Sequence, residues 1–178
     1  SKTITSLPTD MKFGDTSIFF DGTDEYLLTP VHADFEFDGE FTIDAWVRFG
    51  TASVWNDFIS SEQYFRVGYN GNFVFRVNNQ NELAFQVYNG QTTVVVIEGT
   101  TTVSTNTWYH IAVTRDSSNV ITIWLNGVSE GTSTNSVTIN DTDNQITIGK
   151  SDIGYIAGGG SAFAAGNFYI DEVRISKG

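Results

Sequence analysis

The chain has 178 residues, a length that suits one domain built around a single hydrophobic core. Its 9 basic and 21 acidic residues give a formal net charge of −12, which disfavours nucleic acids and anionic membrane surfaces as partners. The absence of cysteine excludes disulfides, thiolate metal sites and a cysteine nucleophile, and no apolar run reaches the ~18 residues needed for membrane insertion.

Apolar and polar residues alternate along much of the chain, which is typical of strands with one buried face. The clearest case is residues 41–49. One predicted face holds Phe41, Ile43, Ala45, Val47 and Phe49, and the other holds Thr42, Asp44, Trp46 and Arg48. We expect the first set to face the core, and Asp44 and Arg48 to bond to neighbouring strands.

Short strands are predicted along the rest of the chain. They cover residues 16–20, 64–69, 72–77, 82–88, 92–97, 108–114, 120–125, 136–139, 145–149 and 168–175. Asn-Gly pairs at 70–71, 89–90 and 126–127 predict tight hairpin turns, because both residue types accept a positive φ. Residues 151–166, rich in Gly and Ala, are predicted to form the one long loop.

About a dozen strands with hairpin links predict an all-β fold of two packed antiparallel sheets, a β-sandwich or jelly roll. No internal repeat or linker interrupts the pattern. We therefore expect residues 1–178 to form a single domain.

Four segments carry a family resemblance. They are Ile18–Leu27 with its Phe-Asp-Gly turn, Phe41–Val47, Trp108–Arg115 running into Ile121–Gly127, and Phe168–Ile175. In order and spacing they resemble the laminin-G-like, pentraxin-related branch of the concanavalin A-like lectin/glucanase superfamily. The resemblance implies a concanavalin A-like jelly roll. That branch contains carbohydrate-binding modules, adhesion domains and phage or bacterial surface proteins. The few lysines, the many Thr and Asn residues and the acidic balance favour an extracellular, cell-surface or virion location.

Catalytic carboxylates are not expected. Glycanases of the superfamily carry a Glu-x-Asp-x-x-Glu arrangement on one strand, and the chain lacks it. The pair Asp171 and Glu172 is predicted to point to opposite faces by strand alternation. His110 lies in a core-like strand without a nucleophile motif nearby, so a serine hydrolase is also disfavoured.

A structural calcium site is predicted at the acidic turn after the first motif. Asp21 and Asp24 supply carboxylates there, and Gly22 supplies a backbone carbonyl. The resemblance places the first and last strands side by side and so brings Asp171 within reach. The alternative is that Asp21 is a turn former that bonds its own backbone.

Loop-borne aromatic residues are the candidates for glycan contacts, because sugar C–H faces pack on aromatic rings while amides bond the hydroxyls. The predicted contacts are Trp55, Asn56, Tyr64, Tyr69 and Tyr155. Trp46, Trp108 and Trp124 lie within the shared motifs and are interpreted as structural. The leading hypothesis is a calcium-stabilised, non-catalytic carbohydrate-binding or adhesion module. The alternatives are a structural or protein-interaction domain without sugar affinity and, more remotely, a glycoside hydrolase.

Overall fold

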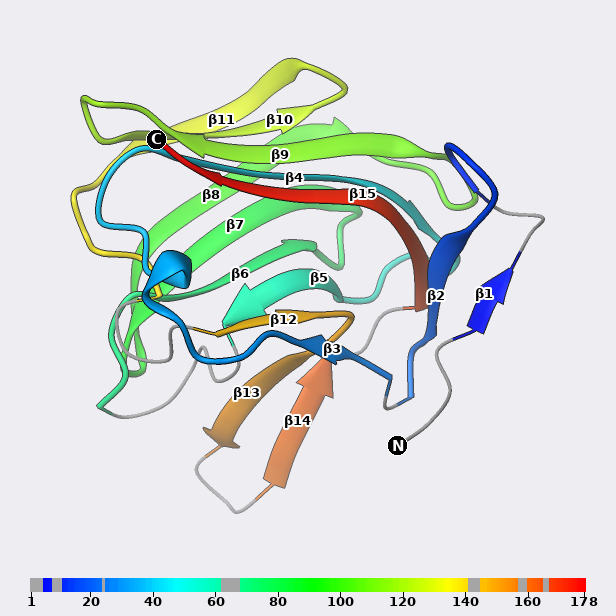
Figure 1. The fold of residues 1–178 in the computed structure, drawn as a ribbon, viewed down its shortest axis with the longest axis horizontal. Helices are drawn as coiled ribbons and strands as arrows, with labels where there is room; N and C mark the ends of the chain where they lie inside the picture. Colours follow the sequence, from blue (N-terminus) through cyan, green and yellow to red (C-terminus); the bar gives the residue numbers. More distant parts are fainter. Residues whose placement is uncertain are drawn as a thin grey trace.

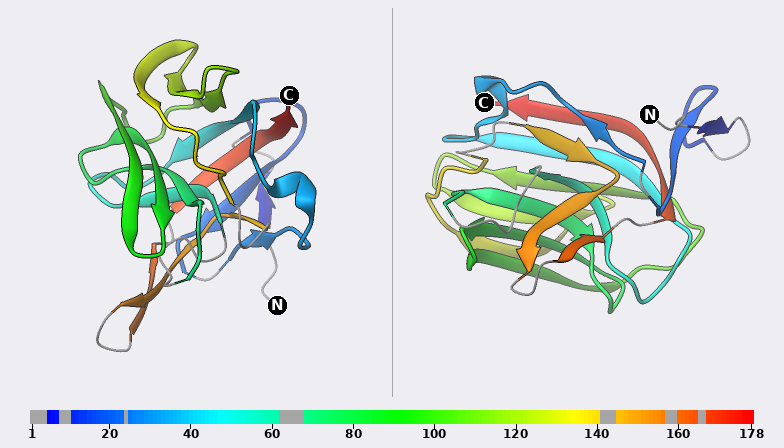
Figure 2. Two further views of the ribbon diagram at one scale, coloured as in Figure 1. Left: turned by 90° about the vertical axis from the view of Figure 1, so that its left-hand side faces the viewer. Right: turned by 90° about the horizontal axis from the view of Figure 1, so that it is seen from below.

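The computed structural model describes residues 5–7, 11–23, 25–61, 68–140, 145–156, 160–164 and 167–178, with backbone alone for 5–7, 151–156 and 160–164. Two antiparallel sheets pack face to face (Figures 1 and 2). The predicted all-β sandwich of the jelly-roll type is therefore confirmed. Within the described residues, no helix is long and apolar enough to cross a membrane.

One sheet has seven strands. In spatial order they are β1 (Thr5–Leu7), β2 (Ser17–Asp21), β15 (Asn167–Lys177), β4 (Phe41–Phe49), β9 (Tyr109–Arg115), β10 (Val120–Leu125) and β11 (Val128–Thr134). The last strand thus lies between β2 and β4, as the red arrow in Figure 1 shows. This position brings the two ends of the chain into one sheet.

The second sheet has six strands. In spatial order they are β3 (Leu27–Leu28), β12 (Ile146–Ile148), β5 (Asn56–Ser61), β6 (Asn72–Val77), β7 (Glu82–Asn89) and β8 (Thr92–Thr102). A short 3-10 helix, η1 (Ala33–Phe35), follows β3 in the chain. Three predicted strands, β4, β6 and β10, match the structure residue for residue, and the other predicted strands that form have shifted ends.

The core lies between the sheets and is rich in phenylalanine. All five residues of the predicted core face of β4 are at most 3% exposed, which confirms the alternation. Phe20 of β2 and Phe168 of β15 pack with ring centroids 5.1 Å apart. Gly149 is required beside them, because a Cβ there would lie 2.3 Å from the Phe20 ring.

Three predictions for individual segments differ from the structure. Residues 151–166 are not one long loop, because β13 (Ser151–Ile156) and β14 (Gly160–Ala164) pair as a hairpin that projects from the sandwich (Figure 1). Asn56 and Asp57 begin the buried strand β5, although Asn and Asp favour turns. The strand expected at 136–139 is reduced to a single bridge between Ile139 and Phe37.

One predicted hairpin turn is confirmed, and another differs from the prediction. Asn126 and Gly127 both have positive φ, of 50° and 79°, and join β10 to β11 as predicted. At the predicted Asn70-Gly71 turn, only Gly71 has a positive φ, of 68°. The strand expected at 64–69 lies mostly outside the described residues, and its described end at Gly68 and Tyr69 is not a strand.

Arg115 ties two connecting segments to the end of β9. It is 2% exposed, and its guanidinium donates to the carbonyls of Gly39, Val137 and Phe37 at 2.7, 2.7 and 2.6 Å. Burial lowers the pKa of Arg115, while the charge of Asp38 acts to raise it. A planar group with several fixed donors is needed to satisfy three carbonyls that point in different directions.

Replacing Arg115 with lysine tests this tie. A single ammonium on a flexible stem cannot reproduce the three guanidinium bonds, so buried carbonyls lose their partners. We expect Arg115→Lys to lower the free energy of unfolding by about 2 to 4 kcal/mol. Urea denaturation followed by tryptophan fluorescence measures the change, and an unchanged midpoint would contradict the assignment.

Glu130 closes the far edge of the sandwich by joining β11 to β8 of the other sheet. Its carboxylate accepts from the backbone amides of Thr100 and Thr101, at 3.0 and 2.9 Å, and from the Thr101 hydroxyl at 2.7 Å. Partial burial acts to raise the pKa of Glu130, but these hydrogen bonds outweigh it and lower the pKa below the ordinary 4.5.

The lowered pKa predicts a pH-dependent contribution to stability. Because the folded state holds the carboxylate in its charged form, the contribution is present above pH 4.5 and disappears as the pH falls through the lower folded-state pKa. We expect Glu130→Gln to reduce stability at pH 7 by less than about 1 kcal/mol, since solvent screens the group. Thermal unfolding at pH 7 and pH 3 should show the difference between parent and variant shrinking at pH 3.

Candidate functional site

The outer face of the seven-stranded sheet gathers aromatic and charged side chains in its centre. The register places Trp46 of β4 opposite His110 of β9 and opposite Asp171 of β15. Asp44, two residues earlier on the same face of β4, stands opposite Arg174. Strand alternation places Asp44 and Trp46 here, because the residues between and beside them fill the core.

Asp44 is the charged anchor of this face. Its side chain is 8% exposed, and one oxygen accepts from Arg174 Nε at 2.9 Å. The other oxygen lies 3.3 Å from His110 Nε2. Both carboxylate oxygens are therefore engaged, and the 68% exposed Arg174 side chain is held at the surface by a nearly buried partner.

The segment 11–16, which precedes β2, forms a wall beside Trp46. The Phe13 ring is 50% exposed and meets the Trp46 ring edge to face, with centroids 5.6 Å apart. The ammonium of Lys12 lies 4.1 Å from the centre of the Trp46 ring. Asp171 holds this segment in place, because its carboxylate accepts the backbone amides of Lys12 and Phe13 at 3.1 and 3.0 Å.

A β-bulge in β15 shapes the opposite side of the site. Asp171 pairs with Trp46 and Arg174 with Asp44, so two residues of β15 oppose the single Ala45 of β4. The extra residue is Glu172, whose φ of +51° is in the left-handed region. The predicted alternation of Asp171 and Glu172 is therefore wrong, because the bulge interrupts it and Glu172 lines the outer-face pocket.

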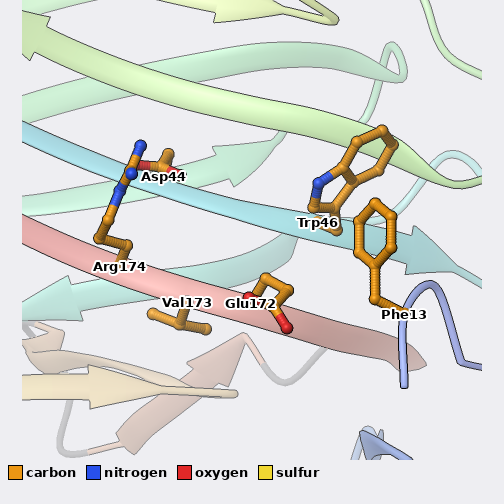
Figure 3. A pocket seen from close by; sticks show the side chains of 6 residues that line it. All are labelled: Phe13, Asp44, Trp46, Glu172, Val173 and Arg174. Carbon is orange, nitrogen blue, oxygen red and sulfur yellow. The ribbon is translucent and has the colours of Figure 1, made fainter. Parts of the chain in front are cut away.

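These residues enclose an open pocket of about 600 Å³, a volume within the usual range of ligand sites. We call it the outer-face pocket, and its lining consists of Phe13, Asp44, Trp46, Glu172, Val173 and Arg174 (Figure 3). Aromatic rings stand at one end and the Asp44–Arg174 ion pair at the other, with Glu172 between them along β15 (Figure 3). Rings suit the C–H faces of a sugar, and the charged groups suit its hydroxyls.

Two of the predicted calcium residues, Asp21 and Asp171, lie apart. β2 and β15 are neighbours, as expected, but Asn167 is the residue opposite Asp21. Asp171 lies four residues further along β15, a distance of about 13 Å, and its carboxylate is occupied by backbone amides. Asp24 is outside the described residues.

The turn at Asp21 behaves as the turn-former alternative describes. The Asp21 carboxylate accepts from the backbone amide of Thr23 at 2.8 Å and from the Thr23 hydroxyl, while Glu25 accepts from the Asp21 amide at 3.4 Å. In the described part of the chain, no three His, Cys, Asp or Glu side chains form a group that could hold a metal ion. Asp21 and Asp171 therefore lie too far apart to share one calcium ion, and the calcium prediction is limited to the turn at Asp21 and Gly22.

The three predicted glycan contacts with described side chains do not form one surface. Trp55 is 38% exposed, and its ring lies over the Arg76 guanidinium at 4.7 Å. Asn56 is fully buried and donates to the carbonyls of Thr51 and Val54, so it braces the loop and faces no ligand. Tyr69 lies at the other end of β6, about 17 Å away along the strand.

The remaining two predicted contacts cannot be placed. Tyr64 is outside the described residues, and only the backbone of Tyr155 is described, in β13. Among the described side chains, no other predicted contact lies beside Trp55 at the surface. Beneath it, Arg76 forms a buried ion pair with Asp57, with Nε and Oδ1 2.8 Å apart.

Sequence reasoning overlooked most of the outer-face pocket. The sequence indicates a structural role for Trp46, predicts opposite faces for Asp171 and Glu172, and gives no role to Phe13. One signal was available, since the alternation of residues 41–49 already placed Asp44 and Trp46 on the face away from the core. Nothing in the sequence showed that segment 11–16 would fold over that face.

Comparison with known proteins supports the fold. The family described as the concanavalin A-like lectin/glucanases superfamily matches residues 21–178. No curated protein sequence matches the chain.

Among solved structures, three neighbours illustrate the range. A Bacteroides ovatus protein assigned to carbohydrate binding has a TM-score of 0.61 at 20% identity, covering 88% of this chain and 42% of that one. Domains LG4-5 of mouse laminin α1 give 0.64 at 15%, covering 90% and 40%. The Ruminococcus gnavus sialidase module CBM40, bound to α2,3-sialyllactose, gives 0.56 at 11%, covering 75% and 76%. The chain thus spans less than half of the first two, and at these identities the likeness shows the fold.

The calcium prediction can be tested at the Asp21 turn. If calcium binds there, saturating calcium should raise the unfolding midpoint of the parent by about 5 to 10 °C over a chelator. Asp21→Asn should abolish that difference, because it removes a charged ligand while it keeps the turn-forming side chain. Asp171→Asn should retain the difference, since Asp171 lies elsewhere. Identical midpoints with calcium and chelator in the parent would instead identify Asp21 as a turn former.

Proposed function

The chain belongs to the concanavalin A-like lectin/glucanases superfamily, and on that premise we propose that it is a non-catalytic carbohydrate-binding module. The observation that carries the proposal is the outer-face pocket. It combines an exposed aromatic ring, Phe13, with the charged side chains of Glu172 and Arg174 in one hollow. A pyranose needs this combination, because its C–H face is apolar while its rim carries hydroxyls that donate and accept hydrogen bonds.

The state of the carboxylates supports binding without hydrolysis. A glycoside hydrolase needs two carboxyl groups that face the scissile bond, one as acid and one as nucleophile or base. Asp44 is engaged by Arg174 and His110, and Asp171 accepts three backbone amides, those of Lys12, Phe13 and Glu172. Glu172 is then the one carboxylate lining the pocket that forms no bond with the described residues through its side chain.

The wider setting is also a proposal. The chain spans 42% of the Bacteroides ovatus neighbour and 40% of the laminin neighbour, which fits a module of a larger protein. We place that protein outside the cell, on a cell surface or on a virion, where glycans are displayed. We also propose that calcium stabilises the Asp21 turn, where the Asp21 carboxylate and the Gly22 carbonyl supply oxygen ligands.

The alternative is a protein-interaction domain without sugar affinity. Tyr26, Leu28 and Val31, at 45%, 41% and 65% exposed, lie on and beside β3 at the edge of the six-stranded sheet. Exposed apolar side chains at a sheet edge suit contact with another chain. If this alternative holds, the chain should bind no glycan and should bind a protein partner through that edge.

Two exposed aromatic residues make a matched test of where glycan binds. On a glycan array followed by calorimetry with the best hit, we expect Phe13→Ala to weaken binding by about tenfold or more, since it removes a ring wall of the pocket. Trp55→Ala, an aromatic truncation on the other sheet, should leave affinity within about twofold.

The two variants separate the alternatives. Loss of binding in Trp55→Ala alone would move the site to the six-stranded sheet and contradict the pocket assignment. A parent that binds no glycan on the array would favour the protein-interaction domain. Thermal unfolding of both variants serves as the control, because neither side chain is in the core and each should fold as the parent does.

A further inference from the structure

Glu172 occupies a backbone conformation that disfavours a side chain. Its φ of +51° is the left-handed region, where the Cβ of an L residue crowds the following carbonyl. Bulges that need this conformation commonly use glycine, which has no such conflict. The chain instead has a long, charged residue at this position. Because its strained backbone lowers folding stability, we expect the side chain to have a function that offsets this loss.

The bulge also decides where that side chain goes. In an unbroken strand, one residue between Asp171 and Arg174 would face the core opposite Ala45. Val173 fills that role and packs against the core cluster. Glu172 is the additional residue, and its exposed side chain lines the outer-face pocket between Val173 and the Phe13–Trp46 wall (Figure 3).

The charges around the pocket determine what Glu172 can recognise. Arg174 is balanced by Asp44, and Lys12 lies over the Trp46 ring. In the described part of the chain, the Glu172 carboxylate has no side-chain partner, so its oxygens are available as acceptors. The formal charge of −12 on the whole chain adds to its negative potential. A carboxylate accepts hydrogen bonds from hydroxyl groups, and it repels a ligand carboxylate or sulfate.

We propose that Glu172 is the specificity-determining residue of the outer-face pocket, which selects neutral glycans by accepting hydrogen bonds from their hydroxyls and excludes acidic glycans by charge repulsion. The inference rests on the proposed carbohydrate-binding function. It predicts that replacing Glu172 can raise folding stability while lowering glycan affinity, because the strained conformation is retained for the ligand contact.

Glu172→Gly and Glu172→Gln test the two halves of the inference. Glycine relieves the left-handed strain, so we expect the unfolding midpoint to rise by about 2 to 4 °C. The same variant should lose tenfold or more in affinity for neutral glycans. Glutamine keeps the shape of the side chain without its charge, and should weaken neutral glycan binding three- to tenfold while acidic glycans gain affinity.

Ser53→Gly is the matched control. Ser53 has a similar φ of +58° but does not line the pocket, so its replacement should leave glycan affinity within about twofold. The array should contain neutral, sialylated and sulfated glycans, and calorimetry with the best neutral and the best acidic glycan provides the affinities for every variant.

The outcomes distinguish the inference from the function on which it rests. If the parent binds glycans but Glu172→Gly binds neutral glycans as tightly as the parent, the inference is overturned and the proposed function stands. A parent that prefers acidic glycans over neutral ones also overturns the inference and leaves the proposed function standing. A lower midpoint in Glu172→Gly overturns the argument from strain. If the parent binds no glycan at all, the proposed function fails first, and the inference fails with it.

Discussion

The position of β15 between β2 and β4 is the constraint on which the rest of the molecule depends. It is hydrogen-bonded to both neighbours and so joins the two parts of the seven-stranded sheet. In this position its Phe168 and Ile170 are buried against the second sheet. The same pairing joins Arg174 to Asp44 across 130 residues of sequence and Asp171 to Lys12 across 159. Each side of the outer-face pocket therefore exists only when the sandwich is complete, and the site is a product of the global fold.

A single strand, β4, serves the core and the site at the same time. Its odd-numbered residues are buried between the sheets, and its even-numbered residues Asp44 and Trp46 lie on the outer face. Ala45, the smallest residue of the core face, is the one that stands opposite the bulge of β15. The bulge changes the face that β15 presents without displacing the core, because Val173 keeps the apolar position that an unbroken strand would have filled.

The fold was predictable from the sequence because it depends on period-two patterning and turn residues, which local sequence records. Residues 41–49 showed their core face, and Asn126-Gly127 showed its hairpin. The site was less predictable, because it depends on contacts between residues that lie far apart in the sequence. The bulge at Glu172 follows from pairing with β4, and the strand at Asn56 and Asp57 depends on the ion pair with Arg76 nineteen residues later. Phe13 reaches Trp46 only through the Asp171 tether.

The superfamily name joins lectins and glucanases, and the arrangement of the carboxylates near the outer-face pocket favours the first over the second. Three acidic side chains lie near the outer-face pocket. Asp44 is committed to an ion pair and Asp171 to three backbone amides, so both stabilise the arrangement of the site. Among the residues that the structure describes, Glu172 is then the carboxylate of this pocket whose side chain has no bonding partner. A single carboxylate provides a hydrogen-bond acceptor but not the acid and nucleophile pair of a hydrolase. Under the proposed function, this distribution of the three groups accounts for recognition without cleavage.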